Sequence, residues 1–292
     1  MPHDRFVWMD RNGKTEPLSE TTGYFEYATL SPDESRLAVF VGGANNSIWI
    51  YDIARATMTR FVSGFENMWP IWTPSGDRVT FVSDRSGAFN LYWQATDGSA
   101  PLERLTTSEF NERPGSWSPD GQWLAFDESS PETGRNIWML SMEGDRSPRP
   151  FAQSASNETT PQFSPDGRFL AYVSDESGRR EIYLQRFPTS GRKWQVSTAG
   201  GRSPLWNSNG REVVYRNGSE ILAVDIDTRG ELSLGNPRVL FEAPSAFRGP
   251  LGISADGRRL LFIDRSAAPA APTHLVLVQN WAEELKRLAP AN

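Results

Sequence analysis

One short phrase recurs six times along the 292-residue chain and constrains the fold more than any other feature. In its clearest copies an aromatic residue precedes Ser-Pro-Asp-Gly, as at residues 117–121 and 163–167. Counted at the third residue of the phrase, the copies are 42 to 47 residues apart. These third residues are Pro32, Pro74, Pro119, Pro165, Ser208 and Ala255. Such a period is typical of a β-propeller in which each repeat forms one four-stranded blade.

The segments between the copies carry the signals of strands and hairpins. Each phrase is followed by a short apolar run, by a polar turn such as residues 83–87, and by a second β-rich run such as residues 91–93. Asp-Gly and Ser-Gly turns between such runs predict antiparallel hairpins. The sequence therefore predicts an all-β fold, a six-bladed β-propeller with four-stranded antiparallel blades, which forms a single domain over residues 1–292.

The aromatic residue of each phrase is predicted to be structural. Pro presets the first corner of the turn, and Gly accepts the positive φ that follows it. The aromatic side chain should then end the innermost strand and pack between neighbouring blades, as we expect for Trp117 and Phe163. Recurrence at one place in the repeat favours a core position over a row of ligand-stacking sites.

A closed ring needs a seam, and the two ends of the chain can supply it. The sixth repeat gives three predicted strands, near residues 251–254, 260–263 and 275–278. The apolar segment 6–9 is predicted to complete this last blade, which would leave only short edges exposed. Residues 16–18 have no place in this scheme, and residues 281–288 are predicted to form a short C-terminal helix.

These residues resemble a known family. The pattern Trp-Ser-Pro-Asp-Gly-x-x-Leu-Ala-Phe at residues 117–126 is similar to the WD-like repeat of TolB-type six-bladed propellers. The resemblance covers about the whole chain, and such a fold alone does not determine a function. It implies a bacterial module outside the cytoplasm that binds proteins, or a gating domain as in prolyl-oligopeptidase-like peptidases. The ending 279–286 also resembles propellers that follow a membrane span in bacterial serine/threonine kinases, so a kinase or other domain in a longer parent protein is a further expectation.

Composition narrows the chemistry that the chain can perform. It has no Cys, which excludes disulfides, thiolate metal sites and cysteine nucleophiles. Its two His residues are His3 and His274, and it has no Gly-x-Ser-x-Gly motif, so we assign no catalytic residue and no cofactor. A net charge of −6 argues against a nucleic-acid partner. No apolar run reaches the roughly 18 residues of a membrane span, and the first residues do not predict a signal peptide.

Polar and charged residues gather in the loops that lead into the predicted innermost strands. These loops should surround the channel of the propeller. They form either a mixed-charge mouth that binds a polar ligand, a cation or a peptide, or ordinary solvated loops. The candidate ligand-binding residues are Glu66, Asn67, Trp69, Asn111, Glu112, Arg113, Asn157, Glu158, Arg202 and Arg248.

Aromatic residues occur in the same loops. Exposed beside arginines, they would suit a protein or peptide interface. Buried, they would instead wedge the blade junctions, and the sequence is compatible with both. The residues are Tyr24, Phe25, Phe65, Trp69, Phe110 and Phe247.

Two functions remain open at this point. The first is a monomeric, non-catalytic binding or sensor propeller that recognises a protein, peptide or polar small ligand at the channel mouth. The second is a metal-dependent hydrolase or lactonase-like enzyme, with loop carboxylates and asparagines as oxygen ligands in the channel. Calcium bound by Glu66, Glu112 and Glu158 is a weaker expectation, because no Asp-x-Asp-x-Asp-Gly loop supports it. Convergence of oxygen ligands on one point would distinguish the two functions.

Overall fold

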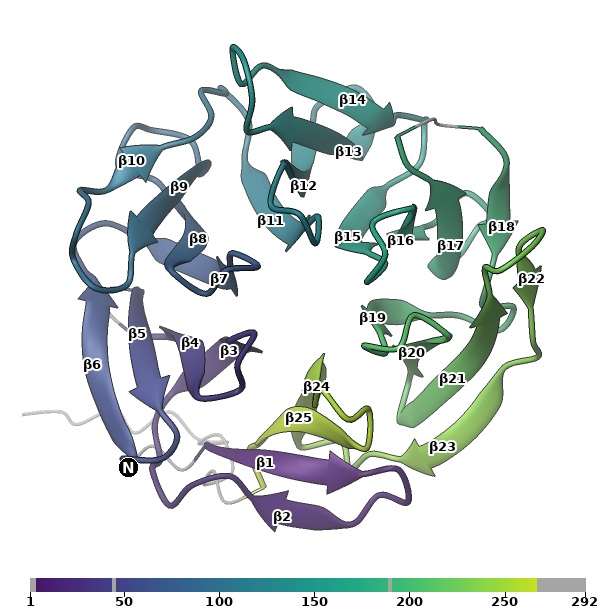
Figure 1. The fold of residues 1–292 in the computed structure, drawn as a ribbon, viewed down its shortest axis with the longest axis horizontal. Coiled ribbons are helices and arrows are strands. Elements are labelled where there is room, and N and C mark those ends of the chain that lie inside the picture. The colour runs from purple at the N-terminus through teal and green to yellow at the C-terminus, as the bar shows by residue number, and fades with distance from the viewer. Residues whose placement is uncertain (1–3, 44–45, 189–190, 267–292) are drawn as a thin grey trace, which may run out of the picture.

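The strands form a ring of six sheets around a central channel (Figure 1). This computed structural model describes residues 4–43, 46–188 and 191–266. Each sheet is one blade, and the first strand of each repeat lines the channel, with the later strands following outward. All strand pairs are antiparallel, as the hairpin turns predict. The prediction of a six-bladed, all-β propeller is therefore confirmed.

Blades 1 to 4 each contain four strands in chain order. Blade 1 contains β3 (Phe25–Leu30), β4 (Arg36–Val41), β5 (Ser47–Asp52) and β6 (Thr57–Val62). Blade 2 contains β7 (Asn67–Trp72), β8 (Arg78–Ser83), β9 (Asn90–Ala95) and β10 (Glu103–Arg104). Blade 3 contains β11 (Glu112–Trp117), β12 (Trp123–Ser130), β13 (Gly134–Ser141) and β14 (Pro148–Ala152). Blade 4 contains β15 (Glu158–Phe163), β16 (Phe169–Ser174), β17 (Glu181–Arg186) and β18 (Lys193–Gln195).

Blades 5 and 6 depart from this plan. In blade 5 two short strands pair with the third strand, and blade 6 joins both ends of the described chain. Blade 5 contains β19 (Arg202–Trp206), β20 (Glu212–Asn217), β21 (Glu220–Asp227), β22 (Ser233–Leu234) and β23 (Arg238–Glu242). Blade 6 contains β24 (Phe247–Ile253), β25 (Arg259–Asp264), β1 (Arg5–Asp10) and β2 (Thr15–Pro17).

The N-terminal segment closes the ring, as predicted, but it does so with two strands. β1 pairs with β25 from Arg5 opposite Asp264 to Asp10 opposite Arg259, and β2 adds the outermost strand. β1 thus takes the position next to β25 that the sequence suggested for residues 275–278. The residues near Glu16, which had no place in the predicted scheme, form β2. Residues 275–278 and the predicted helix 281–288 lie outside the described residues.

The aromatic residues of the repeat connect neighbouring blades. Trp117 is 7% exposed, and its indole N–H donates to Thr80 Oγ1 of blade 2 across 3.2 Å. In the same way, Trp72 donates to the carbonyl oxygen of Thr29 in blade 1. Phe163 is buried at the next junction. Their predicted role in the inter-blade core is confirmed.

The turn of each phrase has a local cause. In blade 3 the Ser118 hydroxyl donates to Asp120 Oδ1 at 2.5 Å, and this bond lowers the pKa of the Asp120 carboxyl. Gly121 follows with φ of +71°, a conformation that glycine adopts at little cost. In blade 1, where the repeat has Glu34 instead of Gly, the residue takes the same left-handed conformation with φ of +59°. The turn geometry therefore survives this departure from the motif.

No helix that is long and apolar enough to cross a membrane occurs in the part of the chain that the structure describes.

Candidate functional site

The innermost strands turn selected side chains into the channel by means of β-bulges. In blades 2, 4 and 5 the register shifts where a residue before a proline adopts the left-handed conformation. Trp69, Thr160 and Ser203 have φ of +50°, +52° and +53°. Such a conformation is rare for bulky and β-branched residues and is concentrated at functional sites. A bulge re-aims the side chain that it carries, and all three residues line one pocket at the channel mouth.

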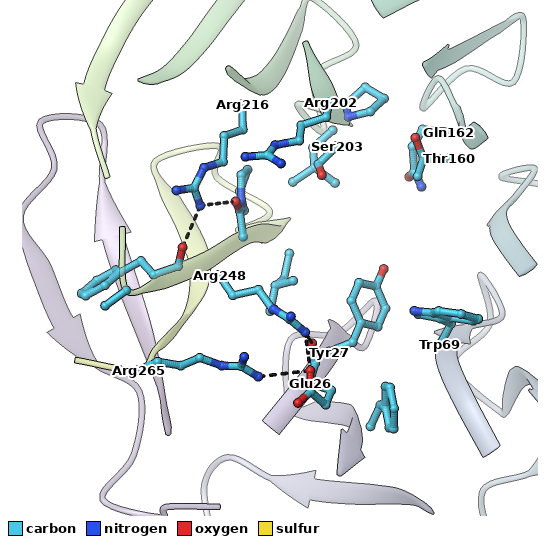
Figure 2. A pocket seen from close by; sticks show the side chains of 18 of the residues that line it. Glu26, Tyr27, Trp69, Thr160, Gln162, Arg202, Ser203, Arg216, Arg248 and Arg265 are labelled. Atoms are coloured by element: carbon cyan, nitrogen blue, oxygen red, sulfur yellow. Dashed lines mark hydrogen bonds and ion pairs between the residues drawn. The ribbon is translucent and has the colours of Figure 1, made fainter. Parts of the chain in front are cut away.

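This pocket, called the mouth pocket here, has a volume of about 650 Å³ and opens where the innermost strands begin. Figure 2 shows its arrangement: arginines from blades 5 and 6 form one wall, and Tyr27 and Trp69 lie on the opposite side. Glu26 is the only carboxylate among the residues that line it. The arginines are Arg202, Arg216, Arg248 and Arg265. The mouth pocket therefore carries a surplus of positive charge although the whole chain is acidic.

Two of the arginines share the Glu26 carboxylate. Arg248 Nη1 donates to Glu26 Oε2 and, at 2.7 Å, to the Glu26 carbonyl oxygen. Arg265 Nη2 lies 3.2 Å from Glu26 Oε2, and its Nε lies 3.4 Å from Asp4 Oδ2. Burial raises the pKa of the Asp4 carboxyl, although Arg265 opposes that effect. Acidic groups of the chain thus largely balance the positive charge of Arg248 and Arg265.

The positive charges of the other two arginines, Arg202 and Arg216, have no acidic partner among the described residues. Arg216 is 9% exposed and is fixed by three carbonyl groups: its Nε donates to Gly218, and its Nη1 donates to Phe247 and Gly249. Arg202 lies opposite it in the β19–β20 register. Burial lowers the pKa of Arg216, and the nearby charge of Arg202 lowers it further. Two guanidinium groups of the same charge therefore lie close together in a cavity.

Three of the ten candidate residues line the mouth pocket, namely Trp69, Arg202 and Arg248. Arg113 lies next to them: its guanidinium is 5.7 Å from the centre of the Trp69 ring and donates to buried Asp127 at 2.9 Å. The Arg113 guanidinium can therefore hold the Trp69 ring in its position.

The three candidate asparagines tie loops together. Asn111 Oδ1 accepts the N–H of Phe89, and Asn157 Oδ1 accepts the N–H of Arg135, so each links its blade to the preceding one at 3.1 Å. Asn67 is buried, and its amide donates to the carbonyl oxygen of Gly64 at 2.7 Å. None of the three lines the mouth pocket.

The candidate glutamates do not converge. Glu112 accepts the Thr106 hydroxyl and the Leu91 N–H in a buried position between blades 2 and 3. Glu158 accepts the Ser154 hydroxyl, also in a buried position, and Glu66 has no side-chain partner in the described part of the chain. In residues 4–43, 46–188 and 191–266, no three His, Cys, Asp or Glu side chains lie close enough to hold a metal ion. The calcium site expected at these glutamates therefore has no geometric support.

Glu112 is expected to make stability depend on pH. Burial raises the pKa of its carboxyl from 4.5 to about 7. The folded state thus retains a proton that the unfolded state has lost, and the free energy of unfolding falls as pH rises from about 4.5 to about 7. The loss should be on the order of 3 kcal/mol. Glu112→Gln should remove this contribution, which urea unfolding at pH 5 and pH 8 can measure.

The control for this prediction is Glu66→Gln, which changes a side chain without a partner in the described residues. It should leave the pH dependence of unfolding unchanged. Equal stability of wild type and Glu112→Gln at both pH values would show that the Glu112 carboxyl titrates normally.

Sequence reasoning missed two arginines of the mouth pocket. Arg216 lies on the second strand of blade 5, and Arg265 directly follows β25. Both lie outside the loops that lead into the innermost strands. The available signal is in β20, where Arg216 directly follows the apolar run 213–215 and is itself buried.

Exposed aromatic side chains extend the same face over blades 1 to 3. Tyr24, Phe65 and Phe110 are 58%, 59% and 40% exposed, and each directly precedes or lies close to the start of an innermost strand. Phe25 and Phe247 from the same set of loops are buried. We call the three exposed residues the aromatic rim.

Comparison with known proteins identifies the family. The model of the TolB beta propeller domain (PD40) matches residues 108–279, more than half of the chain. The chain belongs to the TolB β-propeller family. Among curated proteins, the uncharacterized protein Atu1656 of Agrobacterium fabrum is 26% identical over 222 residues, which cover 70% of this chain and 74% of that protein.

Solved structures share the TolB-type fold at low sequence identity. A protein assigned as TolB from Agrobacterium tumefaciens superposes with a TM-score of 0.73 at 18% identity, covering 90% of this chain and 98% of that one. An oligogalacturonate lyase in complex with manganese superposes with a TM-score of 0.62 at 14% identity, covering 89% and 82%. The fold of this family thus occurs in proteins with different described activities, and the site must carry the functional argument.

Proposed function

We propose that this TolB-family propeller is a non-catalytic binding module, and that a protein partner binds across the face where the mouth pocket opens. The observation that carries the proposal is the charge of that pocket, which has four arginines around one glutamate in an acidic chain. An acidic segment of a partner would be attracted to this face and would gain charge-assisted hydrogen bonds there.

The aromatic rim supports a macromolecular partner. Solvent-exposed aromatic side chains and arginines on one face of a protein have the composition of the energetic centres of protein interfaces. The rim lies on blades 1 to 3 and the arginines on blades 5 and 6, and blades 1 and 6 are neighbours in the ring, so the two features together surround much of the channel mouth (Figure 1). A small ligand in the pocket alone would leave the rim uncovered.

The family supports an extracytoplasmic location for this module, since the chain matches the TolB propeller domain and a structure assigned as TolB. We also propose that residues 1–292 form one monomeric propeller domain. In a longer parent protein this domain could be joined to a kinase or another domain. The enzyme alternative would need converging oxygen ligands, and the candidate glutamates and asparagines occupy separate positions. These separate positions favour the binding function.

Site-specific photo-crosslinking in the source organism tests the proposal. A photoreactive phenylalanine analogue at position 65 or 110 should capture a partner protein. The matched control is position 239, where Val239 is 51% exposed on β23 at the outer edge of blade 5. Capture should disappear when Arg202 is changed to Glu. Equal capture at position 239, or none at the rim, would contradict a binding face at the channel mouth.

A further inference from the structure

The mouth pocket contains a cationic pair whose charge the described residues leave unbalanced. Arg202 is exposed to the cavity and makes no ion pair within residues 4–43, 46–188 and 191–266. Arg216 donates Nε and Nη1 to backbone carbonyl groups, while its Nη2 donates to no acceptor in that part of the chain. Figure 2 shows the two guanidinium groups side by side at one end of the pocket. Bringing like charges together costs free energy, which an anion bound between them would recover.

We propose that Arg202 and Arg216 bind one carboxylate of an acidic peptide, and that Glu26 excludes a second one by occupying the adjacent position on Arg248 and Arg265. This inference rests on the proposed function and specifies the ligand of the same face. Arg216 is the rigid member, because three carbonyl contacts fix its guanidinium before any ligand arrives. Arg202 is the adaptable member, since its side chain is exposed.

Glu26 shows what this pocket recognises. Its carboxylate accepts a hydrogen bond from Arg248 and forms an ion pair with Arg265 at 3.2 Å, which is the arrangement that a ligand carboxylate would adopt. Guanidinium groups match carboxylates in planar geometry. Because Glu26 belongs to the chain, it fills this position at no cost in translational freedom. The negative charge of Glu26 would repel a second acidic group of a ligand, so the site would select against ligands that carry one.

The rest of the cavity suits a peptide chain. Thr160 Oγ1 is buried in its wall and has no hydrogen-bond partner among the described residues, so a polar ligand group could satisfy it. Tyr27, Gln162 and Leu205 line both the mouth pocket and a second pocket of about 470 Å³ farther along the channel. An extended segment could therefore continue inward past these residues. The aromatic rim offers apolar contacts to the part of the partner that remains outside.

Binding of capped peptides measured by isothermal titration calorimetry tests the proposal. The probes are a five-residue alanine peptide with one glutamate, the same peptide with glutamine, and a peptide with two adjacent glutamates. The one-glutamate peptide should bind at least tenfold more tightly than the glutamine peptide. Arg202→Gln should remove this difference, and Arg55→Gln, on the exposed turn after β5, should keep it. Equal affinity for glutamate and glutamine peptides would overturn the proposal.

Glu26→Gln gives the second arm, with an effect opposite to that of a simple binding residue. It should tighten binding of the two-glutamate peptide about tenfold and change binding of the one-glutamate peptide much less. Weaker or unchanged binding of the two-glutamate peptide would contradict the role of Glu26. Digalacturonate, which has the same charge as the two-glutamate peptide, is the comparison ligand. Tighter binding of this sugar than of the one-glutamate and two-glutamate peptides would also overturn the peptide assignment.

The binding face and the carboxylate position can be refuted separately. Capture of a partner at positions 65 and 110 together with equal affinity for the glutamate and glutamine peptides would leave the binding face standing and refute the carboxylate position. Absence of capture combined with selective glutamate binding would refute the protein partner instead.

Discussion

Removal of residues 1–18 is expected to abolish the folded propeller. The deletion takes away β1 and β2, and with β1 the side chains of Phe6, Val7, Trp8 and Met9, which are between 0% and 6% exposed. Burial of each contributes about 1.5–3 kcal/mol, so the loss is on the order of 10 kcal/mol. Domains of this kind have a total stability of about 5–15 kcal/mol. The deletion should therefore leave an unfolded or aggregating chain, as measured by circular dichroism and size-exclusion chromatography.

Point variants in the same segment separate this effect from a general effect of shortening the chain. Phe6 stacks on Phe25 of blade 1 with ring centres 4.5 Å apart, so Phe6→Ala should lower the free energy of unfolding by about 3–5 kcal/mol. Glu16→Ala on the exposed strand β2 should change it by less than about 0.5 kcal/mol. A shortened chain that melts within a few degrees of the full chain would show that the seam of the ring lies elsewhere.

Trp117→Ala is expected to have the second-largest effect, and on stability alone. Trp117 stacks on Trp93 with ring centres 5.8 Å apart and packs in the cluster between blades 2 and 3. Truncation of a core aromatic costs about 3–5 kcal/mol, which urea unfolding can measure. Binding of the one-glutamate peptide, measured below the melting temperature, should remain as in the wild type, because Trp117 lies outside the residues that line the mouth pocket around Arg202 and Arg216.

Phe65→Ala is the matched variant, since it truncates an aromatic side chain that is 59% exposed. It should change the free energy of unfolding by less than about 0.5 kcal/mol and weaken partner binding about tenfold or more. Loss of binding in Trp117→Ala at full stability, or a large loss of stability in Phe65→Ala, would reverse the roles that we assign to these two aromatics.

The fold could be predicted from the sequence because its determinants are local and repeated. The Ser-Pro-Asp-Gly turn is stabilised within five residues by the serine hydroxyl, the aspartate and a left-handed glycine, as at Ser118, Asp120 and Gly121. The seam could be predicted only in part. Residues 6–9 and 275–278 are both apolar, and the choice of β1 as the neighbour of β25 depends on pairing across about 250 residues.

The candidate site was harder to predict because a shift of one residue decides which way a side chain points. Successive residues of a strand face opposite sides. Glu112 and Glu158 therefore point into blade junctions, whereas the left-handed bulges at Trp69 and Thr160 turn side chains toward the mouth pocket. Arg265 reaches the pocket from the end of β25, the second strand of blade 6, and nothing in the repeat pattern distinguishes this residue. The sequence identified the loops that surround the channel, but only Trp69, Arg202 and Arg248 of its ten candidate residues line the mouth pocket.

Hydrogen–deuterium exchange of the propeller, with and without the partner recovered by crosslinking, tests whether the partner binds at the channel mouth. We expect slower exchange on binding at the face that carries the mouth pocket and the aromatic rim, in residues 64–69, 109–113, 202–205 and 245–251. Exchange in β6, β14, β18 and β23 at the outer edges of the blades should not change. Protection of those outer strands, or of the Ser-Pro-Asp-Gly turns at the opposite end of the channel, with no protection around the mouth pocket, would contradict binding at the channel mouth.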